Sequence, residues 1–206
     1  MEGPPDSAGE TSHDAAGIPD EDTLLAEVSA IELTPAEHQR IKDIVHGPLL
    51  NRLASHDRRY LIVGAGDDSA AATRRAIVYE ALDGRTDPPA TAIRLEDFDL
   101  TPDEIRLWTR LFDILCGVAT HVVAVVEDFD GGYVWELGLL FAPAYREKTW
   151  VLKRRYPDPR TERERYDNGM AASHVRALLT GDRAHEWTAP SQLREAVAKI
   201  PSSTHD

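Results

Sequence analysis

The sequence has only one cysteine, no long apolar run and few lysines. Cys116 has no second cysteine to pair with, and we expect a small core residue in a reducing, cytoplasmic setting. No apolar stretch approaches the roughly 20 residues that a membrane-spanning helix needs. The chain also does not open with the basic and then apolar segments of a secretory signal. We therefore expect no membrane partner.

Positive charge is absent from the first 39 residues. Residues 1–39 hold ten acidic side chains and neither lysine nor arginine, so they contribute −10 to the formal net charge of −13. Residues 40–206 carry the remaining −3 and are nearly balanced, and no basic stripe indicates a nucleic-acid partner. The excess of 19 arginines over 4 lysines fits a high-GC, halophilic source.

Composition divides the chain into three parts. Residues 1–22 are rich in Pro, Gly, Ser, Ala and acid, and we expect a disordered acidic tail because little apolar surface is available to offset the entropy of ordering. Residues 23–57 are expected to form a helical extension. Thr34-Pro35-Ala36-Glu37 is a capping box for a helix that runs to residue 54, and Gly47-Pro48 should kink or split it. This helix should pack on one face of the domain or serve in a homo-oligomer interface.

Residues 58–201 alternate between strand and helix patterns. Strands are expected at 59–64, 91–95, 122–126, 148–153 and 185–187. Helices are expected at 69–82, after a second capping box at 101–104, and at 132–145, 170–179 and 191–200. The helix after 101–104 should bury one stripe of residues: Ile105, Trp108, Leu111, Phe112 and Leu115. The alternation predicts a single α/β domain, flavodoxin-like (Rossmann-like), with a five-stranded parallel sheet in the order 2-1-3-4-5 and helices on both faces.

The most informative segment is Val122–Leu140, which reads VVAVVEDFDGGYVWELGLL. Its β-branched run predicts a strand buried on both faces. Three acids follow at the carboxyl end of that strand, where open α/β sheets bind ligands: Glu127, Asp128 and Asp130. Mutual repulsion should raise the pKa of one of these acids. The pair Gly131-Gly132 would let the backbone approach a ligand closely.

The segment Asp130-Gly131-Gly132-Tyr133-Val134-Trp135-Glu136-Leu137-Gly138 resembles the Asp-x-Gly-Thr-x-x-Glu-Leu-Gly signature of nucleoside 2-deoxyribosyltransferases, with Tyr133 in place of the threonine. It is also similar to the Glu-Leu-Gly helix of TIR-like nucleotide-binding proteins. In both groups the glutamate acts at the anomeric carbon of an N-ribosyl bond. The resemblance implies that Glu136 is the catalytic carboxylate, that Asp130 hydrogen-bonds the base, and that the two glycines make room for the sugar.

Glu136 and Asp130 each have a structural alternative. An acid in the first turn of a helix can simply stabilise the helix dipole, and Asp130 can simply cap the helix. The helix around Glu136 is apolar nearly all round, however, and burying an unpaired acid is costly, which favours a polar cavity or a partner. Because neighbouring helical residues face directions about 100° apart, Trp135 should then pack into the core or an oligomer interface.

Further substrate contacts are expected at the ends of the first two strands. Gly64-Ala65-Gly66-Asp67 forms either a tight turn with an acidic cap or a loop that admits a ribose, with Asp67 accepting from its hydroxyls. A serine replaces the third glycine of the dinucleotide motif and the acids would repel a pyrophosphate, which disfavours NAD as a bound cofactor. We also assign Asp97, Asp128 and Tyr133 to the substrate site. The histidines lack metal-ligand spacing, and we expect neither a metal nor a cofactor.

Two functions remain open. The first is an enzyme that hydrolyses the N-ribosyl bond of a nucleoside, a nucleotide or NAD, or transfers its base, with a carboxylate at the anomeric carbon. The second is a non-catalytic nucleotide-sensing or interaction module of TIR-like fold. The arginine-rich residues 154–167 are interpreted as a solvated charged loop, with a lid or phosphate clamp as the alternative.

Overall fold

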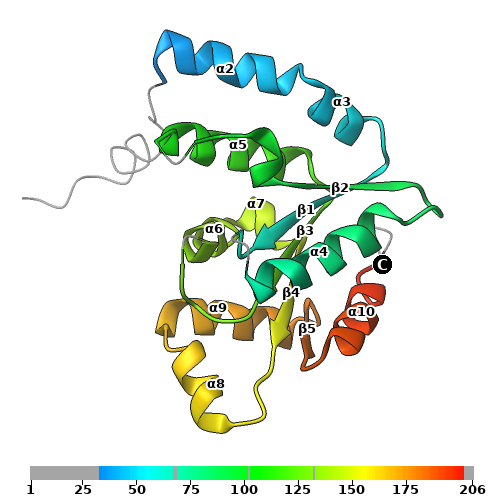
Figure 1. Ribbon diagram of the computed structural model, residues 1–206, viewed down its shortest axis with the longest axis vertical. Coiled ribbons are helices and arrows are strands. Elements are labelled where there is room, and N and C mark those ends of the chain that lie inside the picture. Colours follow the sequence, from blue (N-terminus) through cyan, green and yellow to red (C-terminus); the bar gives the residue numbers. More distant parts are fainter. Residues whose placement is uncertain (1–32, 67–68, 102, 132, 202–206) are drawn as a thin grey trace, which may run out of the picture. The chain divides into compact units, whose positions relative to one another are not determined.

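The computed structural model describes residues 33–66, 69–101, 103–131 and 133–201, and it shows a five-stranded parallel sheet between layers of helices (Figure 1). The strands are β1 Arg58–Gly64, β2 Ala90–Arg94, β3 His121–Val126, β4 Thr149–Arg154 and β5 Ala184–Trp187. Their order is β2-β1-β3-β4-β5 and every pairing is parallel. The predicted α/β Rossmann-like fold and strand order are confirmed.

The helices form a layer on each face of the sheet. Their bounds are α2 Pro35–Val45, α3 Pro48–Ala54, α4 Ala70–Asp83, α5 Ile105–Val118, α6 Tyr133–Leu139, α7 Pro143–Arg146, α8 Pro159–Arg165, α9 Gly169–Thr180 and α10 Pro190–Ala198, with a 3₁₀ turn η1 at Leu95–Phe98. Helices α4 and α10 cover one face, whereas α5, α6 and α9 cover the other, where α2 and α3 add an outer layer (Figure 1). No helix in these ranges is long and apolar enough to cross a membrane.

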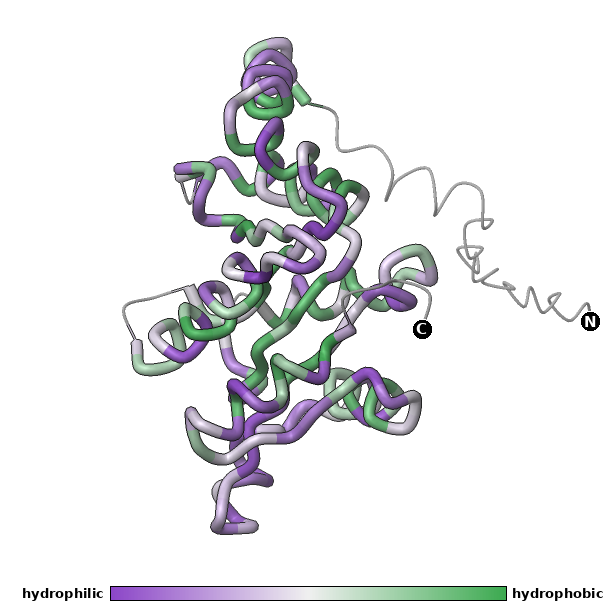
Figure 2. Tube along the Cα trace, turned by 90° about the vertical axis from the view of Figure 1, so that its right-hand side faces the viewer, coloured by the Kyte–Doolittle hydropathy of each residue, from purple (hydrophilic) through white to green (hydrophobic). Residues whose placement is uncertain are grey.

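Two apolar clusters hold these layers together. Alternate residues of β1 enter opposite clusters: Leu61 packs with α5 and α6, and Ile62 packs with α4 and α10. All six residues of β3 are buried, as the β-branched run predicted. Figure 2 shows the resulting pattern, with hydrophobic strands in the interior and hydrophilic residues on the outer sides of the helices.

The helical extension packs on the domain from Leu33 onward. The predicted capping box is present, since the Thr34 amide donates to the Glu37 carboxylate at 2.6 Å and the Glu37 amide donates to the Thr34 hydroxyl at 3.3 Å. The helix splits into α2 and α3 at Gly47-Pro48, as predicted. Four of its apolar residues join the cluster around α5: Ile41, Ile44, Leu50 and Leu53. The predictions for residues 1–32 lie outside the described residues.

Three predicted elements differ from the structure. Helix α5 buries the predicted Leu111, Phe112 and Leu115 and also Leu107, but the predicted Ile105 is 62% exposed and Trp108 is half-buried, because Ile105 is the first residue of the helix and lies at the edge of the core. The predicted helix at 132–145 is divided into α6 and α7, because Pro143 cannot donate a helical hydrogen bond and begins a new helix. The predicted loop 154–167 contains α8, which has no buried residue and therefore no apolar periodicity to reveal it.

The different burial of Leu111 and Ile105 can be tested with a pair of alanine substitutions. Leu111→Ala should lower the free energy of unfolding by about 2–5 kcal/mol, because a fully buried side chain leaves a cavity. Ile105→Ala should change it by no more than about 0.5 kcal/mol, as is usual for exposed positions. Urea melts measure both values. Equal losses would show that Ile105 belongs to the buried stripe after all.

Candidate functional site at the carboxyl ends of β1 and β3

The site lies where the chain reverses its winding between β1 and β3. Helix α4 connects β1 to β2 across one face, and α5 connects β2 to β3 across the other. The loops that leave the carboxyl ends of β1 and β3 therefore diverge, which is the geometry that creates a ligand crevice in open α/β sheets. Gly64 ends β1 opposite Val125 of β3, so the two predicted ligand loops begin side by side.

Gly64 is required by a close approach between these two strands. Its φ is +148°, and a Cβ atom at this position would lie 2.8 Å from the carbonyl oxygen of Val125. The loop that follows passes Arg75, whose Nη2 would lie 3.9 Å from a Cβ atom on Gly66. The two alternatives for this loop, a tight turn and a loop that admits a ribose, are not distinguished, because Asp67 lies outside the described residues.

Arg75 of α4 is the centre of the site, and the sequence analysis missed it. Its side chain is 5% exposed; Nη1 donates to the Gly64 carbonyl oxygen at 2.9 Å and Nη2 forms an ion pair with Glu96. Its charge also acts on Glu136 of α6. A signal was present, because Arg75 stands in the buried stripe of α4 with Val78 and Leu82. An arginine in an apolar stripe needs buried acceptors.

Glu136 is a half-buried residue in the first turn of α6. Leu137 and Leu140 enter the core, and the ring of Trp135 lies 6.4 Å from that of Phe112 of α5. Burial raises the pKa of the Glu136 carboxyl to about 7, and Arg75 opposes this rise. Within the described residues its side chain accepts no hydrogen bond. A carboxyl that is half ionised near neutral pH can donate a proton or act as a nucleophile.

Trp135 does not pack into the core as predicted. It is 44% exposed, because Leu137 and Leu140 already occupy the side of α6 that faces the sheet. The alternative prediction, an oligomer interface at Trp135, remains open.

Two of the three acids after β3, Glu127 and Asp128, are paired with arginines. Glu127 is 5% exposed and accepts from both Arg74 and Arg154. Asp128 lies 3.4 Å from the guanidinium of Arg165 and accepts the Asp130 amide at 3.2 Å. The arginines compensate the charges of Glu127 and Asp128, whereas no ion pair with Glu136 occurs among the described residues.

The other residues predicted to contact the substrate are Asp130, Gly131, Gly132, Tyr133 and Asp97. Asp130 and Gly131 are exposed in the turn before α6, and Gly131 has a φ of +87°. Gly132 lies outside the described residues, and the structure places Tyr133 only by its backbone, at the start of α6. Asp97 is turned away to Arg94, whose amide and Nη2 donate to it at 2.8 Å and 2.7 Å. No group of three potential ligands for a metal occurs in the parts of the chain that the structure describes.

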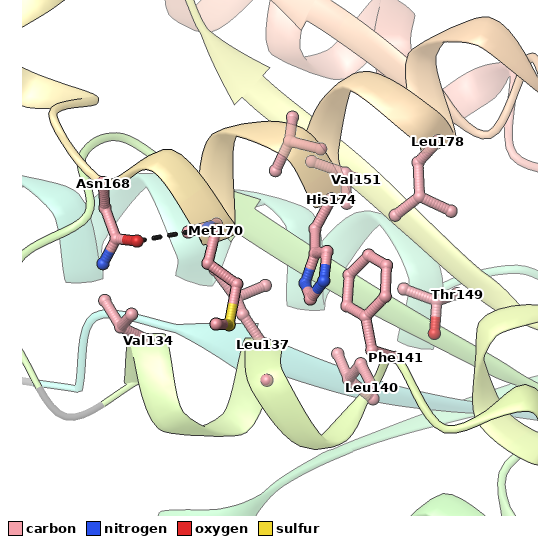
Figure 3. Close-up of a pocket in the computed structure, with 13 residues that line it drawn as sticks. Val134, Leu137, Leu140, Phe141, Thr149, Val151, Asn168, Met170, His174 and Leu178 are labelled. Atoms are coloured by element: carbon pink, nitrogen blue, oxygen red, sulfur yellow. Dashed lines mark hydrogen bonds between the residues drawn. The ribbon is translucent and has the colours of Figure 1, made fainter.

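A small apolar cavity lies on another side of α6. It has a volume of about 100 Å³ and is lined by Val134, Leu137 and Phe141 together with Met170 and His174 of α9 (Figure 3). Glu136 is not among its lining residues. Asn168 caps α9 beside it by accepting from the Ala171 amide at 3.2 Å (Figure 3). This cavity therefore belongs to the packing between α6 and α9.

The burial of Glu136 predicts a pH-dependent effect of Glu136→Gln. The native carboxyl has a pKa of about 7 against an ordinary 4.5, so the native state binds the proton more tightly and the wild type loses stability as the pH rises from 4.5 through 7. Glutamine does not ionise, so the Glu136→Gln variant should become more stable than the wild type as the pH rises from 4.5 through 7. Above this range the difference in the free energy of unfolding should stay constant. Urea melts at several pH values measure the difference. A glutamine variant less stable than the wild type at pH 8 would instead make the carboxylate a structural ion-pair partner.

Comparison with known proteins identifies a family but no function. No curated protein matches the chain. A family model matches residues 19–177, a range that includes β1 to β4 and the positions of Arg75, Glu127, Glu136 and Arg154. Because this match covers more than half of the chain, the protein belongs to the family of unknown function DUF8170.

Proposed function

We propose that the protein cleaves the N-ribosyl bond of a nucleoside, a nucleotide or NAD, by hydrolysis or by transfer to another base. The observation that carries this proposal is the state of Glu136. Its carboxyl is buried enough to have a pKa of about 7, and it is influenced by Arg75 at the winding reversal, where open α/β sheets bind their ligands. Perturbed acids at such positions are typical of catalytic groups.

The chemistry requires a carboxylate beside the anomeric carbon. As the C1′–N bond breaks, its electron pair leaves with the base and C1′ gains oxocarbenium character. The ionised Glu136 then forms a bond to C1′ or stabilises its charge, and water or a second base displaces it. The leaving base takes up one proton, which the attacking water supplies in hydrolysis and the incoming base supplies in transfer. Asp130, exposed in the turn before α6, is our candidate for the hydrogen bond to the base.

Arg75 is a positioning residue in this scheme. Burial alone would keep Glu136 protonated to still higher pH, and the charge of Arg75 counteracts that effect. The same guanidinium holds the Gly64 carbonyl oxygen and thereby the start of the loop at Gly64–Gly66. Without side chains at the two glycines, this loop leaves room for a ribose near Glu136.

A second function is supported by the arginine pairs. Glu127, Asp128 and Asp97, three of the acids near the strand ends, are held by arginines and are not available to a substrate. A site with so few free groups also suits a nucleotide-sensing or interaction module of TIR-like fold that performs no chemistry. Thermal-shift measurements distinguish the two, since a sensor is stabilised by a nucleotide that it leaves intact.

Base release should depend on Glu136. Over a panel of nucleosides, nucleoside monophosphates and NAD, the wild type should release a free base from at least one compound, and Glu136→Gln should be slower by about 10²–10⁴-fold. Glu164→Gln, an exposed change on α8, is the control and should keep wild-type rates. Chromatography of the products measures the rates. Equal rates in wild type and Glu136→Gln would remove Glu136 from the mechanism.

The rate should also depend on pH through Glu136. A carboxylate nucleophile is active when ionised, so kcat/KM should rise with pH through about 7. Arg75→Gln should move this rise to higher pH, because Arg75 lowers the pKa of Glu136. Arg110→Gln, which removes an exposed arginine of α5, should leave it in place. A rate that falls as pH rises through 7 would indicate a protonated Glu136 acting as general acid.

A further inference from the structure

The Glu127 carboxylate is shared by two guanidinium groups. Arg74 donates from Nε at 2.6 Å and also from Nη2, while Arg154 donates from Nη1 at 2.7 Å. Glu127 is almost fully buried, whereas the side chains of Arg74 and Arg154 are 18% and 28% exposed. One negative charge cannot neutralise two positive ones, so this cluster of three residues keeps a net positive charge that solvent can reach.

Arg154 is the less satisfied of the two arginines. Within the described residues, no acceptor reaches its buried Nε, and Nη1 is its only atom with a hydrogen bond to an acid. The rings of Tyr156 and Trp187 lie 4.8 Å and 5.7 Å from its guanidinium carbon. Aromatic faces attract and orient a guanidinium, but they do not remove its charge. Arg154 is thus held in place with donors to spare.

The cluster lies on the same edge of the sheet as Glu136. Glu127 directly follows β3, Arg154 ends β4, and Arg74 precedes Arg75 on α4. Two consecutive arginines of α4 therefore act on two acids at the carboxyl ends of the strands. Arg75 acts on Glu136, and Arg74 forms an ion pair with Glu127. Two oriented guanidiniums with surplus positive charge are suited to a phosphate group, which accepts several charged hydrogen bonds at once.

We propose that Arg74 and Arg154 bind the phosphate of the ligand, so that the site takes a nucleoside monophosphate in preference to a free nucleoside. The nucleoside part of this inference rests on the proposed function, whereas the phosphate part rests on the cluster alone. Glu127 accepts hydrogen bonds from both guanidiniums and holds them in place, and the phosphate oxygens bind the guanidinium N–H groups that do not donate to Glu127.

The alternative is that the cluster only fastens α4 to β3 and β4. Both accounts expect a loss of stability when an arginine is removed, so stability alone does not separate them. Glu127→Gln separates them, because it frees the donors without removing either positive charge. In a phosphate site, added phosphate should stabilise this variant at least as strongly as the wild type. In a purely structural cluster, phosphate should stabilise neither protein.

The test measures thermal unfolding of the full chain against inorganic phosphate, with chloride at equal ionic strength as the reference. The wild type and Glu127→Gln should show a saturable rise in melting temperature with phosphate. Arg154→Gln and Arg74→Gln should weaken the apparent affinity by at least about tenfold, as expected when a charged donor is lost. Arg155→Gln is the matched control, because Arg155 is the next residue, is 58% exposed and pairs with Glu186 instead of Glu127. This variant should bind phosphate with the same affinity as the wild type.

A second arm compares the four nucleoside 5′-monophosphates with the four nucleosides by the same method. At least one monophosphate should bind more tightly than both its nucleoside and inorganic phosphate, and Arg154→Gln should abolish the preference over the nucleoside. The inference is overturned if phosphate acts no differently from chloride, or if Arg155→Gln weakens it as much as Arg154→Gln. Phosphate binding without base release from any compound would leave the subsite standing and refute the proposed enzymatic function.

Discussion

Arg75 is the group on which the arrangement of the site depends. Its guanidinium comes from α4 on one face of the sheet, holds the carbonyl oxygen of Gly64 at the end of β1, pairs with Glu96 after β2, and acts on Glu136 of α6 on the other face. A buried arginine must satisfy its donors. The acceptors of Arg75 are the Gly64 carbonyl oxygen after β1 and the Glu96 carboxylate after β2, so one side chain joins these two loops and also lowers the pKa of Glu136 against the effect of burial.

Two acids at this edge of the sheet, Glu127 and Glu136, differ in how their charge is compensated. Glu127 is compensated by two arginines and is fixed as a structural anchor. Glu136 has a single arginine acting on it and accepts no hydrogen bond among the described residues, so burial moves its pKa towards neutral pH. The difference between a compensated and an uncompensated acid, nine residues apart, is what separates a structural role from a chemical one in our account.

The sequence could predict the sheet because its signals are local. The β-branched run of β3, the capping box at Thr34 and the Gly47-Pro48 break are each contained in a few residues, and they are present as predicted. Helix α8 escaped prediction because Asp158 caps it but no residue of it is buried, which leaves no apolar period. The position of Glu136 in the first turns of a helix after β3 also followed from the sequence, although its electrostatic state did not.

The partners of the site residues could not be predicted, since they are distant in the chain. Arg74 and Glu127 are separated by 53 positions, and nothing local marks them as a pair. Arg154 was interpreted as part of a solvated loop because its neighbours are charged, yet it ends β4 beside two aromatic rings. The measurement that tests the central claim most directly is an NMR titration of the side-chain carboxyl carbon of Glu136, assigned by its loss in Glu136→Gln. Our account predicts a midpoint near pH 7 in the wild type. A midpoint at the ordinary value of 4.5 would show a solvated carboxylate and would contradict the account.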